Sequence, residues 1–108
     1  DRVAALPRAD VPVDGVTAYL SQGPDHQIVF FEIEPTAEVP PHSHGEQWGI
    51  VVEGRMRLTI GGETREYGPG DSYHIPAGVV HGATFSTRTR VIDFFADRDR
   101  YAPIDAPL

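Results

Sequence analysis

The sequence of 108 residues contains no cysteine, so it can form neither a disulfide bond nor a thiolate metal ligand. Any metal site must therefore be built from nitrogen and oxygen donors. Basic residues are also few: nine Lys and Arg stand against sixteen Asp and Glu, which gives a formal net charge of −7. An acidic chain of this kind argues against nucleic acid or an anionic membrane surface as the main partner.

Long hydrophobic runs are absent as well. No segment approaches the roughly 20 apolar residues of a transmembrane helix, and no basic-then-apolar leader follows Asp1. We therefore expect a cytoplasmic location. Glycine or proline also interrupts every segment that could show a 3.6-residue period, which argues against long amphipathic helices. The length predicts one domain, residues 1–108.

What the sequence does contain is alternation and frequent punctuation. Eleven glycines and ten prolines divide the chain into short segments. In residues 28–34, for example, Val29, Phe31 and Ile33 fall on one face of an extended chain. About nine to eleven short strands follow, at the spacing of a β-sandwich or barrel. The clearest predicted strands are residues 16–20, 28–34, 55–60, 63–67, 72–75, 80–85 and 89–96.

The two ends of the chain fit this pattern less well. Pro7 and Pro12 forbid a central position in a sheet, so residues 1–15 are predicted to form an N-terminal arm or an edge strand. Residues 97–108 are charged and contain proline, and are predicted to form a C-terminal tail that packs over the surface.

Three histidines and one glutamine have the spacing of a metal site. His42 and His44 point the same way if their segment is an extended strand, and Gln47 follows closely. His81 comes at the end of a Pro-Gly turn and would have to reach the site from a neighbouring strand. Three imidazoles and an amide oxygen suit Zn, Ni, Fe, Mn or Cu rather than Ca or Mg. The alternative to a metal site is that His42 and His44 are exposed loop residues and that His81 is unrelated to them.

The same residues carry a resemblance to the cupin superfamily. Its first motif, G-x5-H-x-H-x3,4-E-x6-G, is matched here by Thr36, His42, His44, Gln47 and Gly54. Its second motif, G-x5-P-x-G-x2-H-x3-N, is matched by Gly70, Pro76, Gly78, His81 and Phe85. This resemblance implies an all-β, single-domain cupin fold, which is a jelly-roll barrel also called a double-stranded β-helix.

The chain departs from the motifs at a few positions. Thr36 replaces a glycine, Phe85 replaces an asparagine, and the gap after the second histidine is one residue short. Counting back from Gly54 puts Gln47 at the place of the motif's acid. The alternative is Glu46, which would break the spacing to Gly54 and lie on the opposite face of the strand.

Glutamine at this position changes the expected chemistry. A wholly neutral ligand set leaves a divalent ion its full charge, so the ion is a stronger Lewis acid and attracts an anionic substrate more strongly. We expect it to bind less tightly than it would to a set with a carboxylate. A neutral set is also less suited to stabilising Fe(III), which argues against dioxygenase chemistry.

A narrower resemblance concerns the segments around Gln47 and Asp93. The sequence Glu-Gln-Trp-Gly-Ile-Val-Val-Glu-Gly-Arg and the later Val-Ile-Asp-Phe-Phe are similar to the KdgF-like branch of small cupins, which linearise unsaturated uronates. The resemblance implies a catalytic Asp93 and the metal ligands His42, His44, Gln47 and His81. Asp93 also stands among apolar residues, where a carboxyl group facing a cavity could act as a general acid or base. The alternative is an outward-facing Asp on an edge strand.

These observations lead to one functional hypothesis and two alternatives. We expect a metal-dependent enzyme with one divalent transition metal (Zn, Ni, Mn or Fe) that acts on a small anionic carbonyl compound. Isomerisation with ring opening of an unsaturated uronate is the specific reaction implied by the resemblance. One alternative is a metal-dependent dioxygenase, and the other is a small-ligand-binding sensor module without turnover.

Two further expectations concern side chains on either side of the predicted barrel. Trp48, Ile50 and Val52 lie opposite Gln47 in parity, so they should face away from the interior, against a covering strand or a second subunit. This stripe and the cupin resemblance predict a homodimer. Four aromatic side chains are candidates either for the wall of the cavity or for the ordinary core: Tyr19, Phe31, Phe85 and Phe95.

Overall fold

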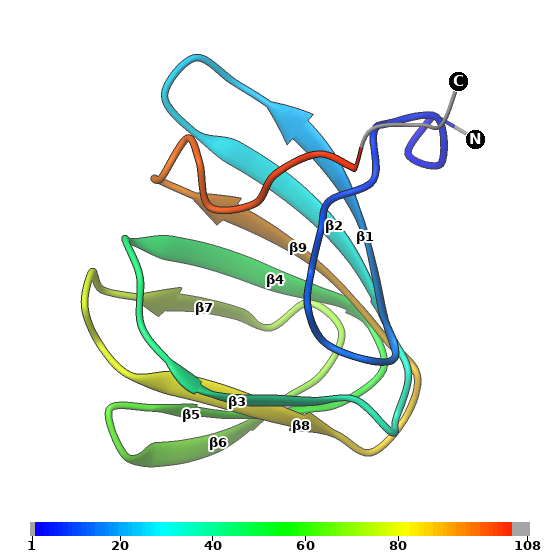
Figure 1. The fold of residues 1–108 in the computed structure, drawn as a ribbon. Helices are drawn as coiled ribbons and strands as arrows, with labels where there is room; N and C mark the ends of the chain where they lie inside the picture. The colour runs from blue at the N-terminus through cyan, green and yellow to red at the C-terminus, as the bar shows by residue number, and fades with distance from the viewer. Residues whose placement is uncertain (1, 105–108) are drawn as a thin grey trace.

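A computed structural model describes residues 2–104; Asp1 and residues 105–108, which belong to the predicted arm and tail, lie outside the described part. The described residues contain no helix, and so none that could cross a membrane. They form nine strands (Figure 1). The strands are β1 (Val16–Gln22), β2 (Gln27–Ile33), β3 (Glu38–His42), β4 (Gln47–Glu53), β5 (Met56–Ile60), β6 (Glu63–Tyr67), β7 (Ser72–Ile75), β8 (His81–Phe85) and β9 (Thr89–Phe95).

The strands form two antiparallel sheets that face each other (Figure 1). The five-stranded sheet has the order β1-β2-β9-β4-β7, and the four-stranded sheet has the order β3-β8-β5-β6. Strands that are distant in sequence are neighbours, as when β9 lies between β2 and β4. This is the jelly-roll arrangement, so the all-β cupin fold predicted from the sequence is confirmed.

Alternation along the strands decides which side chains fill the interior. In β2 and β9 every second side chain is buried, and Val29, Phe31 and Val91 lie in the core. In β4 the parity places Gln47 and Val51 inside. Trp48, Ile50 and Val52 are exposed on the other face, as their parity predicts, and no strand of residues 2–104 covers them.

The segment before the first histidine differs from the sequence-based expectation. Residues 38–41, which are not among the clearest strands predicted from the sequence, form most of β3 and pair with β8. Because β3 is an edge strand, Pro40 and Pro41 do not deprive a second neighbour of hydrogen bonds. His42 is the last residue of β3, whereas His44 lies beyond the strand. The expectation that both histidines share one strand face is therefore wrong in its local geometry.

The N-terminal arm and the C-terminal tail are held together across one opening of the barrel. The Asp10 amide donates to the Ala102 carbonyl (2.8 Å), and the Ile104 amide donates to the Arg8 carbonyl (2.7 Å). Gln27, which is buried, fixes the tail to β2: its Nε2 donates to the Tyr101 carbonyl (2.8 Å), and its Oε1 accepts from the Tyr101 amide (3.0 Å). The tail residues before Tyr101 are thereby held close to the interior.

Gly54, the last residue of the first motif, has a structural reason to be glycine. Its φ is +90°, a backbone conformation that costs other residues energy. In addition, a Cβ here would press against the carbonyl oxygen of Arg88, which is backbone and cannot rotate away. Gly62 has a similar φ of +85°, but a Cβ there would meet no atom within 4 Å.

Comparing Gly54→Ala with Gly62→Ala separates the two costs. Both substitutions should lose about 1–2 kcal/mol from the unfavourable φ. Gly54→Ala should lose about 1–3 kcal/mol more from the contact with Arg88. Urea unfolding of the two variants and the unsubstituted protein measures both effects, and equal losses would show that the close approach at Gly54 is unimportant.

Candidate functional site

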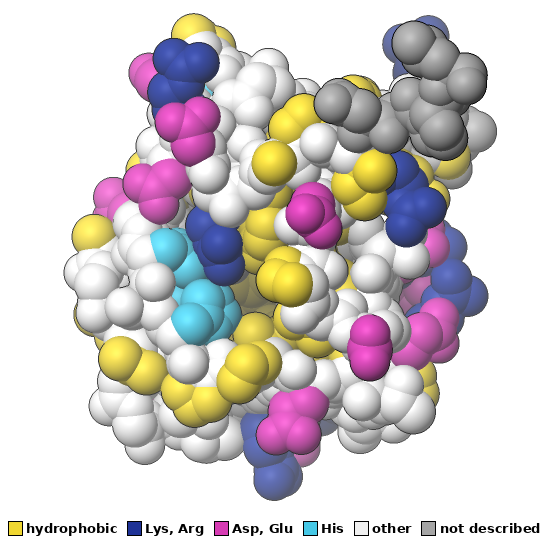
Figure 2. Space-filling view, in the orientation of Figure 1, with side chains coloured by type: hydrophobic (Ala, Val, Ile, Leu, Met, Phe, Trp, Pro, Cys, Tyr) yellow, Lys and Arg dark blue, Asp and Glu magenta, His cyan; other side chains and the backbone are white. Residues whose placement is uncertain are grey.

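A cavity of about 320 Å³ lies between the two sheets, and it contains the residues singled out from the sequence. Histidine side chains gather at its rim, beside a hollow lined by apolar side chains (Figure 2). All five predicted site residues line it: His42, His44, Gln47, His81 and Asp93. The structure therefore brings together residues from β3, β4, β8, β9 and the connection after β3.

The three histidines converge on one point. The distances between ring centroids are 4.3 Å for His42 and His81, 4.8 Å for His44 and His81, and 5.2 Å for His42 and His44. One potential ligand atom from each ring lies within 4.8 Å of the others. His81 reaches the site because β8 pairs with β3 in a register that puts His81 directly beside His42.

Backbone carbonyl groups fix how each ring is turned. The Nδ1 atoms of His42, His44 and His81 lie 2.9, 2.8 and 3.0 Å from the carbonyl oxygens of Pro40, Gly45 and Val79. Because a carbonyl oxygen can only accept, each Nδ1 carries the hydrogen, and the lone pair lies on Nε2. This is how metal-binding histidines are usually oriented by a second partner.

The surroundings keep at least two of these rings neutral. Burial, followed by the positive charge of Arg100, lowers the pKa of His44 to about 4. The pKa of His81 is also lowered, chiefly by burial. Near neutral pH both imidazoles therefore have the uncharged form that a metal ion requires, and no proton must be displaced.

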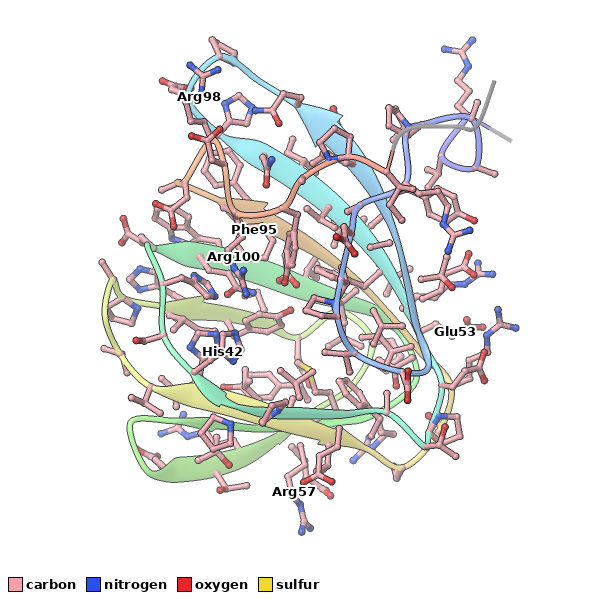
Figure 3. All side chains as sticks on the ribbon, viewed as in Figure 1. His42, Glu53, Arg57, Phe95, Arg98 and Arg100 are labelled. Carbon is pink, nitrogen blue, oxygen red and sulfur yellow. The ribbon has the colours of Figure 1, made fainter. Side chains whose placement is uncertain are left out.

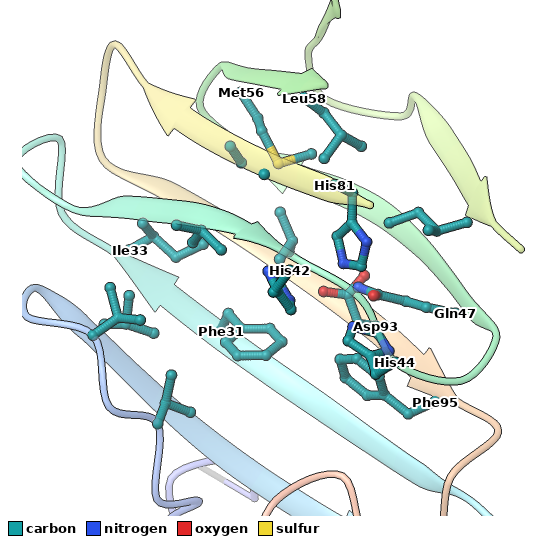
Figure 4. Close-up of a pocket in the computed structure, with 18 of the residues that line it drawn as sticks. Phe31, Ile33, His42, His44, Gln47, Met56, Leu58, His81, Asp93 and Phe95 are labelled. Carbon is teal, nitrogen blue, oxygen red and sulfur yellow. The ribbon is translucent and has the colours of Figure 1, made fainter. Parts of the chain in front are cut away.

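Gln47 and Glu46 point to opposite sides of β4. Gln47 is 7% exposed and lines the cavity, and within the described part of the chain its buried Oε1 has no hydrogen-bond partner. A buried amide oxygen without a partner is costly, and a cation would relieve that cost. Glu46 instead meets His74 outside the cavity at 2.6 Å. The donor set that fits a divalent transition metal is therefore three imidazole nitrogens and the Gln47 oxygen (Figure 4).

Asp93 lies beside this cluster in the interior (Figure 4). Its side chain is 4% exposed, and burial raises its pKa to about 7, against the opposing effect of hydrogen bonds from Tyr73 and Gln47. The Tyr73 hydroxyl donates to Asp93 Oδ1 at 2.5 Å. Burial also raises the pKa of this phenol well above its usual value, so Tyr73 remains a donor. A carboxyl group in these surroundings can give or take a proton near neutral pH.

Gly49 makes the contact between Tyr73 and Asp93 possible. In the register of the sheet, Gly49 on β4 lies between Tyr73 on β7 and Asp93 on β9. A Cβ at Gly49 would collide with both of these side chains. The phenol can therefore reach across β4 to the carboxyl group only because this strand has no side chain between them.

Arg100 adds a positive charge at the mouth of the cavity. It comes from the tail after β9 and lies across the opening towards His42, whereas Arg98 lies at the outer edge of the molecule (Figure 3). The Arg100 guanidinium carbon lies 4.3 Å from the centroid of the Tyr101 ring. Its Nε is buried and has no hydrogen-bond partner among residues 2–104.

Sequence reasoning missed Tyr73, Gly49 and Arg100 as site residues. The alternation in residues 72–75 could have placed Tyr73 inside, opposite the exposed His74. No periodicity exists in the tail that could have pointed to Arg100. Of the four aromatic candidates for the cavity wall, Phe31, Phe85 and Phe95 line it and Tyr19 does not.

Comparison with known proteins agrees with this geometry. The chain is 37% identical over 81 residues to a protein described as H2HPP isomerase from Bacillus subtilis; the match covers 73% of this chain but only 34% of that relative's length. KdgF from Halomonas sp. is similar in structure, with a TM-score of 0.74 and 27% identity over 84% of this chain and 87% of that chain.

An RmlC-like cupin from Shewanella frigidimarina is similar too, with a TM-score of 0.75 and 26% identity over 82% of each chain. The family model described as the Cupin domain matches residues 29–95, which include both histidine motifs and Asp93. The chain belongs to the cupin family.

Proposed function

We propose that this protein is a metal-dependent isomerase that moves a proton within a small anionic carbonyl compound. The observation that carries the proposal is the placement of a buried carboxyl group, Asp93, in the same cavity as three converging imidazoles. A relative named isomerase and the similarity to KdgF support the same class of reaction.

His42, His44, His81 and the Gln47 oxygen would hold one divalent transition metal, either Zn, Ni, Mn or Fe. When bound, the ion would supply Lewis acidity towards a substrate oxygen. The four protein ligands are neutral, so they do not weaken the field of the ion at the substrate. The carbonyl groups behind the histidines keep the rings in the required orientation.

Asp93 would take the proton from the carbon next to the carbonyl group and return it to another atom of the substrate. Tyr73 orients the carboxyl group by donating to Oδ1, and Gln47 provides a second hydrogen bond to it. The cavity is open at its mouth, so a proton held on the carboxyl group can exchange with solvent before it is returned.

Arg100 would bind the negative charge of the substrate. It lines the cavity from the tail, and its positive charge acts on His44 and His81. An arginine in this position pairs well with a carboxylate. An unsaturated uronate, the substrate implied by the sequence resemblance, belongs to this class of anionic carbonyl compounds or their enols.

Deuterium incorporation tests the proposed class of reaction directly. Protein loaded with Zn, Ni, Mn or Fe(II) is incubated in D2O with pyruvate, phenylpyruvate or a 4,5-unsaturated monouronate, and followed by NMR. We expect protein-dependent deuterium incorporation or conversion for at least one compound, without oxygen consumption. Oxygen uptake would favour a dioxygenase, and binding without any exchange would favour a sensor module.

The metal-binding residues are tested by comparing His81→Ala with His74→Ala. His81 is one of the converging rings, whereas His74 is half exposed and paired with Glu46 on the outer face. We expect His81→Ala to weaken Zn²⁺ binding about 100-fold or more and His74→Ala to leave it unchanged. Calorimetric titration measures both affinities, and equal affinities would remove His81 from the site.

The role of Asp93 is tested with Asp93→Asn, which keeps the shape of the side chain and an acceptor for Tyr73. We expect turnover or exchange to fall about 10²–10⁴-fold, the usual contribution of a general acid or base, while bound metal is unchanged. Asp99→Asn, at an exposed position of the tail, should retain full activity. Undiminished activity in Asp93→Asn would exclude a proton-transfer role for this residue.

The anion-binding role of Arg100 is tested by comparing Arg100→Gln with Arg98→Gln. Arg98 is exposed and pairs with Asp99, so its loss should have no effect on the kinetics. We expect Arg100→Gln to raise KM about 30-fold, or about 2 kcal/mol, with a smaller change in kcat. A KM equal to that of Arg98→Gln would argue that Arg100 does not contact the substrate.

A further inference from the structure

The cavity is divided into a polar part and an apolar part. The potential metal ligands and Asp93 provide polar groups (Figure 4), and Arg100 adds a positive charge. His81 pairs with Ile60 at one end of the β5–β8 ladder, and Met56 pairs with Phe85 at the other end. The two pairs are four residues apart along each strand, so the distance between them along the strand is about 13 Å. The cavity is lined by His81 at one end of this ladder and by Met56 and Phe85 at the other.

Beyond the polar part, the wall is made of apolar side chains from both sheets. Val91 is the next inward residue of β9 before Asp93, and it pairs with Phe31 on β2. The N-terminal arm adds Val11 and Val13 to this part of the wall. The main side chains of the apolar wall are Phe31, Ile33, Met56, Leu58, Phe85 and Val91.

Among the described residues, the side chains of this wall offer no hydrogen-bond partner to a substrate hydroxyl group. Two tyrosines line the cavity, but the Tyr73 hydroxyl already donates to Asp93, and Tyr101 lies beside Arg100 at the polar part. The backbone groups of β2, β5, β8 and β9 in this wall are used in the sheet ladders. Each substrate hydroxyl placed here would lose its hydrogen bonds to water without replacement, at a cost of about tenfold in affinity.

We infer that the substrate has two unlike parts: an anionic carbonyl group that lies at the histidines and Arg100, and an apolar ring or short alkyl chain that fills the apolar wall. Only the part of this inference that concerns the anionic carbonyl group rests on the proposed function. A volume of about 320 Å³ is enough for a small organic acid. Dry apolar cavities of roughly half that size bind benzene in other proteins. A heavily hydroxylated sugar acid is therefore a poorer fit than an aryl or alkyl 2-oxo acid.

Met56 and Trp48 allow the apolar part to be observed without any activity. Met56 is the single methionine of the chain and lies in the apolar wall. Trp48 is the single tryptophan and lies on the opposite, outer face of its sheet. In protein labelled with ¹³C at the methionine methyl group, an aromatic ring bound in the cavity should shift the Met56 signal and leave the Trp48 indole N–H unchanged.

Two titrations use this reporter. Toluene, added to metal-free protein, tests the apolar part alone. Pyruvate, 2-oxobutyrate, 2-oxopentanoate and phenylpyruvate, added to Zn²⁺-loaded protein, test the two parts together. We expect the dissociation constant to fall about fourfold for each added methylene, and phenylpyruvate to shift Met56. The hydroxylated 2-keto-3-deoxygluconate should bind no more tightly than pyruvate.

Val39→Phe and Val52→Phe provide a matched pair of variants. Val39 lines the cavity from the edge strand β3 and is only partly buried, so a larger side chain can be accommodated without unfolding. Val52 is 51% exposed on the outer face of β4. We expect Val39→Phe to weaken toluene and phenylpyruvate binding at least tenfold and to leave pyruvate binding unchanged. Val52→Phe should change neither.

The possible outcomes separate this inference from the proposed function. If toluene and phenylpyruvate leave Met56 unshifted, or if phenylpyruvate binds no more tightly than pyruvate, the inference is wrong even where pyruvate still binds at the metal. If toluene shifts Met56 but no 2-oxo acid binds the metal-loaded protein, the apolar subsite is supported and the proposed function is contradicted.

Discussion

The three hydrogen bonds from histidine Nδ1 atoms to backbone carbonyl groups are the interactions on which the site depends. Each turns the Nε2 lone pair of one ring towards the same point; the Pro40 carbonyl lies in β3, and the Gly45 and Val79 carbonyls lie in the connections before β4 and β8. The pairing of β3 with β8 then brings His42 and His81 together from positions that are distant in sequence. The fold thus determines both the position and the orientation of the rings before any ligand is bound.

The neighbouring carboxyl group depends on a different constraint. Asp93 is buried where its charged form is costly, and the Tyr73 hydroxyl offsets part of that cost. This contact requires a strand without a side chain between the two residues, and Gly49 provides it. These polar side chains can lie beside a large apolar wall because each of them either has a hydrogen-bond partner in the protein or faces the cavity.

Much of the fold and part of the site could be predicted from the sequence. Alternation along β2 and β9 and the two histidine motifs gave the all-β cupin fold, and parity placed Gln47 inside and Trp48 outside. The strand character of residues 38–41 was missed because proline argues against a central strand, and β3 is an edge strand. Arg100 could not be found because its position depends on the anchoring of Tyr101 by Gln27, a contact across more than seventy residues.

X-ray absorption spectroscopy of the Zn²⁺-loaded protein tests the central claim most directly, because it identifies the atoms around the ion. The account predicts three imidazole nitrogens and at least one oxygen at about 2.0–2.2 Å, with the outer-shell scattering that imidazole rings produce. Fewer than three imidazoles around the ion, or a first shell made of oxygen alone, would contradict it.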